Sequence, residues 1–267
     1  MWFIAALLTA FAWGAANLYY KKGTDPNDQY SHLKIVVMIG FVMGIHAVSY
    51  MLIKGITFDP FNMIIYLPVS AMYILSMTIG FIGLRYIELS IAAPVQNSAG
   101  AITAILFMIF FPTQLSVLEI FGIIVVTAGV ILLARYEQQN DYEVLLQNGE
   151  KINPKYKLGF LAITFPIGYA LIDGFGSFLD GVYLEKKQWL SEDNALLAYE
   201  FTFLICAIIL YVYLKFVKRE NFKIFKEKDK GIAAILETTG QFFYVSAMAG
   251  NAMIAAPIIA ASGLFSV

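Results

Sequence analysis

The chain consists largely of long, uninterrupted apolar runs that are separated by short polar connections. A helix needs about 20 residues to cross a bilayer, and most of the runs reach that length. They lie near residues 2–20, 34–53, 63–84, 90–111, 117–134, 158–180, 195–216, 231–249 and 252–267. Strands of a membrane barrel would instead alternate in polarity over about ten residues. The runs therefore predict an all-α polytopic membrane protein with about nine helices.

Composition supports this class and excludes several others. Apolar residues make up 60% of the chain and charged residues 14%, and the mean hydropathy is +0.72. The single cysteine, Cys206, lies in an apolar run and excludes a disulfide-stabilised secreted scaffold. A net charge of −1 indicates no nucleic-acid partner. No nucleotide-binding loop is present, so we expect no cofactor and no direct use of ATP.

The basic residues predict how the chain crosses the membrane. Of the 18 Lys and Arg residues, 15 belong to the connections after the first, third, fifth and seventh runs. By the positive-inside rule those connections are cytoplasmic. We therefore expect the N-terminus outside, and the 136–157 linker and the basic segment 215–230 inside.

A repeated tetrapeptide indicates an internal duplication. The sequence Ile-Ala-Ala-Pro occurs at residues 91–94 and again at 254–257, and each copy leads to a glycine, Gly100 or Gly263. Chance recurrence is the alternative in a chain rich in Ile and Ala, but the equal placement of the copies in the order of runs argues against it. An odd number of spans in each half makes the two copies point in opposite directions, an arrangement common among secondary transporters.

The duplication divides the chain into three parts. We expect a first repeat at residues 1–135, a cytoplasmic linker at 136–157 and a second repeat at 158–267. Tight hairpin breaks are predicted at residues 111–114 and at Gly250-Asn251. The second copy meets Val267 before its ninth run is long enough to cross, so the sequence is expected to be truncated at its C-terminus.

Three segments resemble the drug/metabolite transporter superfamily in its ten-helix form with two EamA-type repeats. They are the Trp13-Gly14 pair in the first run, residues 83–94 with their Ile-Ala-Ala-Pro end, and the paired glycines of residues 122–130. The resemblance covers nearly the whole chain and implies a transporter. The chain departs from the family where the rest of helix nine and helix ten would follow.

Ionisable groups inside the runs are the strongest pointers to a site. Placing an Asp in hydrocarbon costs at least about 2.5 to 3.5 kcal/mol. Asp173, Glu200 and Glu237 are embedded, together with His46, and no embedded Lys or Arg neutralises them. The carboxyl groups are therefore either protonated or face a watery cavity that accepts cations, and both possibilities indicate proton or cation traffic.

Glu237 is the first candidate for a substrate-binding or coupling residue. Gln241 and Tyr244 follow it at spacings of four and three, so the three share one helical stripe. The alternative is a carboxylate that reaches the headgroup region. Glu200 has the same depth and a weaker stripe, and for it the alternative is stronger.

Asp173 is the second candidate. Aligning the first run with the sixth places Asn17 opposite Asp173, so the halves would offer an amide and an acid. The same alignment places Trp13 opposite Tyr169. These two rings, with Tyr73 and Tyr244, could line an aromatic cavity, although interfacial or packing roles are more common. Asp180, at the end of the run, is expected to be solvated.

Neutral polar residues complete the candidate site. Gln96 and Asn97 follow Pro94 and suit either a substrate contact or an interhelical hydrogen bond, the latter being commoner. His46 is interpreted as a packed bundle residue rather than a proton carrier. With only His32 beside it, and far away in sequence, it predicts no metal site.

Together these patterns favour a secondary transporter of a small organic metabolite in a bacterial-type cytoplasmic membrane, driven by protons or by exchange. Two alternatives stay open. One is a membrane-embedded enzyme that uses the same carboxyl groups as acid and base. The other is a non-transporting receptor or scaffold, which an apolar interior without a cavity would favour. Substrate, direction and oligomeric state are not encoded in a recognisable motif.

Overall fold

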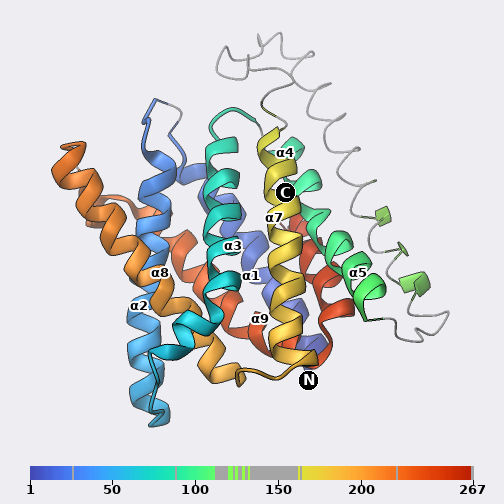
Figure 1. Cartoon of the computed structure of the whole chain (residues 1–267). Helices are drawn as coiled ribbons and strands as arrows, with labels where there is room; N and C mark the ends of the chain where they lie inside the picture. Colours follow the sequence, from blue (N-terminus) through green and yellow to red (C-terminus); the bar gives the residue numbers. More distant parts are fainter. Residues whose placement is uncertain are drawn as a thin grey trace, which may run out of the picture.

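The structure, a computed structural model, describes residues 1–111 and 162–265, with the exception of residues 26, 88, 163 and 221. It also describes a few positions between 120 and 132. The described part is helical and contains no strand. The helices form one bundle, with α2 and α8 on one side, α5 on the other, and α3 and α7 between them (Figure 1). The helices are α1 (Trp2–Gly23), α2 (Ser31–Lys54), α3 (Phe61–Gly83), α4 (Leu89–Asn97), α5 (Ala99–Phe110), α7 (Thr164–Gly181), α8 (Glu192–Val212) and α9 (Lys228–Ala260). This confirms the predicted fold class.

Five of the described helices are long and apolar enough to cross a membrane: α1, α2, α3, α8 and α9. Their outward faces carry large apolar side chains, such as Phe11 and Ile4 of α1, which are 62% and 63% exposed. The inward face of α1 is built from small residues, Ala6, Thr9 and Ala16 among them. Large apolar groups outside and small groups between helices are what a bilayer solvent favours, since lipid tails solvate Phe and Ile as well as a protein core does.

The fourth run is not one helix as the sequence predicts. It is divided at Ser98 into α4 and α5. The Ser98 backbone N–H bonds to the Val95 carbonyl at 3.2 Å and its hydroxyl donates to the same oxygen at 2.6 Å. A serine side chain that competes for a backbone carbonyl tightens the turn and interrupts the regular helical ladder.

The break predicted at Gly250-Asn251 is confirmed. Asn251 lies inside α9 with φ −167° and ψ 83°, so α9 is two helical arms joined at an extended residue. The Asn251 side-chain oxygen accepts a hydrogen bond of 3.3 Å from the N–H of Ile254, which caps the start of the second arm.

The two arms of α9 run back along α1. Gly240, before the break, rests against Trp13, while Gly250 at the break rests against Trp2. The short helical turn η6 (Ala261–Phe265), which follows the second arm, packs against α1 again near Gly14. Contact therefore moves from the middle of α1 to its start and back again, as a helical hairpin requires.

The segments that follow the two Ile-Ala-Ala-Pro copies touch each other in a reciprocal way. A Cβ built on Gly100 would meet the Cβ of Ala260 at 2.6 Å, and one built on Gly263 would meet the side chain of Asn97. Each partner lies three residues before the glycine of the other copy. A twofold relation between the copies would produce this reciprocity.

Helices from the first part of the chain pack mainly on helices from the second part. The first helix, α1, packs on both arms of α9, and α7 packs on α3 and α5, while α2 packs on α8. The linker 136–157, the hairpin residues 112–114 and most of the fifth run lie outside the described residues.

Candidate functional site

One pocket lies among the helices of both halves. Residues of α1, α3, α4, α5, α7, α8 and α9 line it, and the empty space is about 910 Å³ with the solvent at its mouth included. The pocket brings together seven of the nine residues that the sequence proposes as a site. These are Trp13, Asn17, Gln96, Asn97, Asp173, Glu237 and Tyr244.

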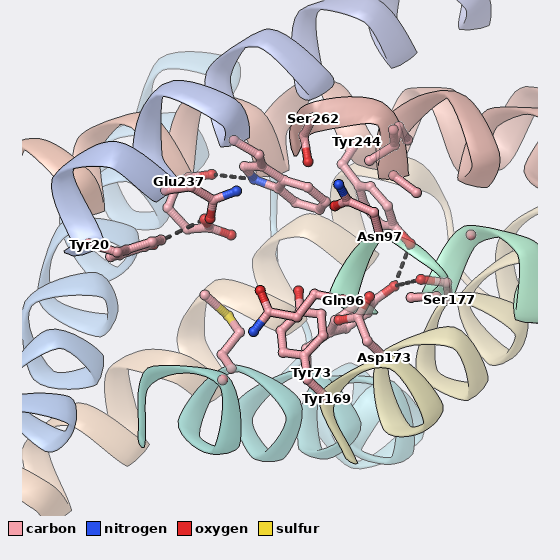
Figure 2. Close-up of a pocket in the computed structure, with 18 of the residues that line it drawn as sticks. Tyr20, Tyr73, Gln96, Asn97, Tyr169, Asp173, Ser177, Glu237, Tyr244 and Ser262 are labelled. Atoms are coloured by element: carbon pink, nitrogen blue, oxygen red, sulfur yellow. Dashed lines mark hydrogen bonds between the residues drawn. The ribbon is translucent and has the colours of Figure 1, made fainter. Parts of the chain in front are cut away.

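Glu237 lies at one end of the pocket and is 6% exposed (Figure 2). The Tyr20 hydroxyl donates to Glu237 Oε2 at 3.0 Å. The indole N–H of Trp13 donates to the Glu237 backbone carbonyl at 3.2 Å. Two residues of α1 therefore hold Glu237 in position: Tyr20 binds its carboxyl group and Trp13 binds its backbone carbonyl. Without the Tyr20 bond, this long side chain would have several rotamers.

Asp173 lies at the other end of the pocket, on α7 (Figure 2). The Ser76 hydroxyl donates to its Oδ1 at 3.1 Å, and Tyr169, one turn earlier on the same helix, lines the pocket beside it. Within the described ranges, none of the ion pairs includes Asp173 or Glu237. Each acid is thus held by a neutral donor, and no basic side chain of the described segments pairs with it.

Three aromatic side chains that line the pocket pack against one another and form an aromatic wall: Trp13, Tyr73 and Tyr244. Trp13 stacks on Tyr244 with ring centroids 5.1 Å apart and planes at 27°. The hydroxyls of Tyr244 and Tyr73 are hydrogen-bonded to each other, and Tyr73 also bonds to Ser177 Oγ at 2.9 Å. The wall offers ring faces for stacking and a line of hydroxyl groups for hydrogen bonds.

Neutral amides lie beside this wall. Gln96 and Asn97 lie at the end of α4, where the helix is interrupted at Ser98, and Asn17 lies on α1. Gln96 lies against Gly80, whose added Cβ would be 3.1 Å from Gln96 Nε2. The amides can donate to or accept from a polar ligand without adding charge.

Two of the proposed residues lie elsewhere. Glu200 is fully buried between α8 and α2, where His46 Nδ1 lies 2.7 Å from its Oε1 and 2.9 Å from its Oε2. His46 is half-buried and has a hydrogen-bond partner within the bundle. Gln241 is 1% exposed but does not line the pocket, and its Nε2 has no hydrogen-bond partner among the described residues. The spacing predicts that Gln241 shares the pocket-facing side of α9 with Glu237 and Tyr244, but only these two line the pocket.

The expectation that Asp180 is solvated is wrong. Asp180 is 0% exposed, and Tyr66 donates a hydrogen bond to its Oδ1. The helical structure continues past Asp180 into the wider turn η3 (Val182–Lys186), so the span ends beyond this residue. Counting from the start of the apolar run placed Asp180 one turn too close to water.

Sequence reasoning missed several polar residues at the pocket: Tyr20, Ser177, Tyr199 and Ser262 line it, and Ser76 holds Asp173 from behind. Serine and tyrosine are common in membrane helices, so their presence alone gives no signal. Helix-face periodicity could have found Ser76, because it lies one turn from Tyr73 and from Gly80 on α3.

The described part of the chain contains no group of three or more His, Cys, Asp or Glu residues that could hold a metal ion. The pocket chemistry is therefore that of two acids, neutral amides, hydroxyls and aromatic rings. Such a lining suits a small polar or cationic ligand.

Comparison with known proteins agrees with this arrangement. A solved structure described as "Crystal structure of protein" superposes with a TM-score of 0.64 over 97% of this chain and 86% of that chain, at 12% sequence identity. A likeness at this identity shows the fold alone. No curated protein matches the chain.

A family model identifies the chain more closely. The model of the EamA-like transporter family matches residues 1–135, which is half of the sequence and contains the Trp13-Gly14 pair and the first Ile-Ala-Ala-Pro copy. The match confirms the resemblance seen in the sequence. The chain is an integral membrane protein that belongs to the EamA-like transporter family.

Proposed function

We propose that this protein is a secondary transporter of a small organic metabolite across a bacterial-type cytoplasmic membrane, working by alternating access. The family supports a membrane transporter with a small-molecule substrate. The observation that carries the proposal is the pocket that helices from both ends of the chain line together. It contains two acids without basic partners among the described residues.

In this proposal Glu237 and Asp173 bind a proton or a cationic group of the substrate. They lie at opposite ends of one pocket, so a bound cation or proton can neutralise one acid while the substrate contacts the other (Figure 2). Asn17, Gln96 and Asn97 orient the substrate through hydrogen bonds, and Trp13 and Tyr244 pack against its apolar or cationic face.

The proposed motion follows from the duplication. Residues 1–135 and 158–267 act as inverted repeats, joined by the linker 136–157, and rock about the pocket that they share. The reciprocal contacts of Gly100 with Ala260 and of Gly263 with Asn97 support this arrangement.

The proposed orientation places the N-terminus outside and the basic connection after α8 inside. Single cysteines introduced at Lys223 and Lys226 in a Cys206→Ser background test it. We expect them to be unreactive toward an impermeant maleimide in intact cells and reactive after permeabilisation. Labelling in intact cells would reverse the orientation.

Transport itself is tested in proteoliposomes. We expect the purified protein to accumulate members of one class in a panel of radiolabelled amines, amino acids, sugars and organic acids, in a manner that depends on a pH gradient or on an exchange partner. Glu237→Gln keeps the shape of the side chain and removes its proton site, so the pH dependence of transport is expected to disappear. Glu192→Gln, at an exposed position at the start of α8, is the matched control. If Glu237→Gln left the pH dependence unchanged, Glu237 would have no coupling role.

Two observations weigh on the alternatives. A receptor or scaffold would be favoured by an apolar interior, whereas this interior contains a polar pocket. An embedded enzyme is not supported by the family, which is a transporter family.

A further inference from the structure

The connection between α8 and α9 presents a surface that is almost purely basic. Within residues 213–230, six basic side chains are exposed, against one exposed acid, Asp229. The six form what we call the basic face: Lys215, Lys218, Arg219, Lys223, Lys226 and Lys228. None of the ion pairs between described residues includes any of them.

The other two acids of this connection are half-buried and already paired. Lys34 of α2 donates to Glu220 Oε2 at 3.1 Å, and Glu227 pairs with Lys230. Both lysines are buried, with exposed fractions of 7% and 5%. Buried lysines therefore neutralise Glu220 and Glu227, and the positive charge of the basic face stays on the exposed side.

Exposed apolar side chains lie among the basic ones. Phe216 and Val217 are 68% and 64% exposed, and Phe225 is 97% exposed. Phe225 lies in the short turn η5 (Ile224–Lys226), between two lysines of the basic face. Lysines mixed with exposed aromatic rings are typical of segments that lie in the headgroup region of a bilayer.

The basic face begins where α8 reaches the edge of the bilayer. Together with the wider turn η4 (Tyr213–Val217), α8 forms a candidate span of 26 residues, Glu192–Val217. At 1.5 Å per residue this span is about 39 Å long, whereas the hydrocarbon is about 30 Å thick. The last turns of α8 therefore reach the headgroups, and Figure 1 shows this end, in orange, at the outer edge of the bundle.

The opposite end of the bundle has no such excess of positive charge. There the exposed Lys54 and Lys187 are matched in number by the exposed acids Asp59 and Glu192. The excess thus belongs to one end of the protein and to one connection.

We propose that the basic face binds the headgroups of anionic phospholipids, and that Phe216 and Phe225 insert beside them. The phosphate diester of such a lipid brings negative charge to the depth at which the basic face lies. Near an anionic surface each Lys or Arg strengthens binding by about 5-fold, and four to eight such residues next to a span form an effective site. The contact would anchor the end of α8 to the lipid whether or not the protein transports a metabolite.

A lipid titration followed by native mass spectrometry tests the basic face on the full chain. Phosphatidylglycerol or phosphatidylcholine with identical acyl chains is added to the protein in neutral detergent, so that only the headgroup differs. We expect the first phosphatidylglycerol to bind at least about 5-fold more tightly than the first phosphatidylcholine. Lys223→Gln combined with Lys226→Gln is expected to weaken phosphatidylglycerol binding by about 5-fold for each lysine and to leave phosphatidylcholine binding unchanged.

Lys54→Gln combined with Lys187→Gln is the matched control, because it removes two exposed lysines from the opposite end. This variant is expected to bind both lipids like the wild type. Equal losses in the two double variants would overturn the proposal, since net charge alone would then explain the preference. Equal affinities of the wild type for the two lipids would overturn it too. Displacement of phosphatidylglycerol by inorganic phosphate would instead make the basic face a site for soluble anions.

The wild type provides a further test that needs no variant to fold. The preference for phosphatidylglycerol is expected to fall as the concentration of ammonium acetate rises, because salt at 0.1 M screens exposed charges beyond about 10 Å. A preference that salt leaves unchanged would overturn the electrostatic contact. Phe225→Ala is expected to weaken the binding of both lipids, and unchanged binding of both would overturn the insertion of this ring.

Discussion

The Tyr20 hydroxyl donates a hydrogen bond of 3.0 Å to Glu237 Oε2, across 217 residues of sequence. This bond joins α1 to α9 at one end of the pocket (Figure 2). It is the only side-chain hydrogen bond to the Glu237 carboxyl that the described residues show.

Tyr20→Phe removes this donor and leaves the ring in place. Since a hydrogen bond to a buried acceptor contributes about 0.5 to 1.5 kcal/mol, we expect substrate affinity to fall by roughly 2-fold to 13-fold. The measurement is the concentration dependence of counterflow in proteoliposomes. Tyr19→Phe, at the neighbouring position outside the pocket, is the matched control. Equal affinity in Tyr20→Phe and the wild type would separate the Tyr20 bond from substrate binding.

The contact between His46 and Glu200 is expected to stabilise the pairing of α2 with α8. Removing one partner of a buried hydrogen bond costs about 1 to 3 kcal/mol, so His46→Leu should lower the thermal stability in detergent. The double variant with Glu200→Gln is expected to be less destabilised than the sum of the two single variants, because Gln leaves a neutral group in the same space. Strictly additive losses would show that the two side chains do not interact energetically.

The helices α2 and α8 approach each other closely at Gly40. A Cβ there would meet the backbone oxygen of Phe203 and lie 2.5 Å from the Cβ of Ala207, neither of which can move without shifting a helix. Overpacking of this kind costs about 1 to 3 kcal/mol, so we expect Gly40→Ala to lower the melting temperature in detergent.

Gly231→Ala is the matched control for this change. Its added Cβ would be 3.5 Å from the end of the flexible Met38 side chain, which is an ordinary contact. The control is expected to melt like the wild type or slightly higher, because alanine favours helix. Equal effects of the two substitutions would contradict the close approach at Gly40.

An ion pair outside the spans gives the protein an acid-sensitive contact. Partial burial raises the pKa of Asp28 and is the largest single effect. The hydrogen bonds from Lys34 at 2.8 Å and from the Tyr30 backbone N–H, together with the positive charges of Lys34 and Lys230, outweigh it and hold the pKa below its usual value of 3.8. Because the folded pKa is the lower one, the stabilisation is complete at pH values above 3.8 and is lost as the pH falls through the folded pKa.

We therefore expect Asp28→Asn to melt at a lower temperature than the wild type near neutral pH, and the difference to shrink as the pH falls below about 4. Melting curves in detergent over a pH series measure this. Asp229→Asn, at an exposed position in the first turn of α9, controls for the general loss of one negative charge. A constant difference at all pH values would mean that Asp28 does not stabilise the fold through its ionised form.

Much of the fold follows from the sequence because the bilayer simplifies the problem. The apolar runs located the five long spanning helices, and Gly250-Asn251 located the break in α9, since an uncharged stretch too long for one span must turn somewhere. The division at Ser98 was not predicted, because it depends on which carbonyl the serine hydroxyl selects.

The site was less predictable because lateral packing decides it. Asp173 and Glu237 stand out as acids in apolar runs, and the pocket contains both. Glu200 stands out equally, yet its neighbour is His46 on another helix, a pairing that no local pattern encodes. Asp180 was misplaced because the end of a hydrophobic run differs from the end of the helix that carries it.

The crossing of Gly100 with Ala260 and of Gly263 with Asn97 has a mechanical consequence. Where helices meet through small residues, few interlocked side chains must change rotamer when one helix turns on the other. The crossing also lies at the pocket, since Gly100, Ala260 and Asn97 all line it. A rotation centred on these contacts would widen one end of the pocket and narrow the other, while the contacts themselves were kept.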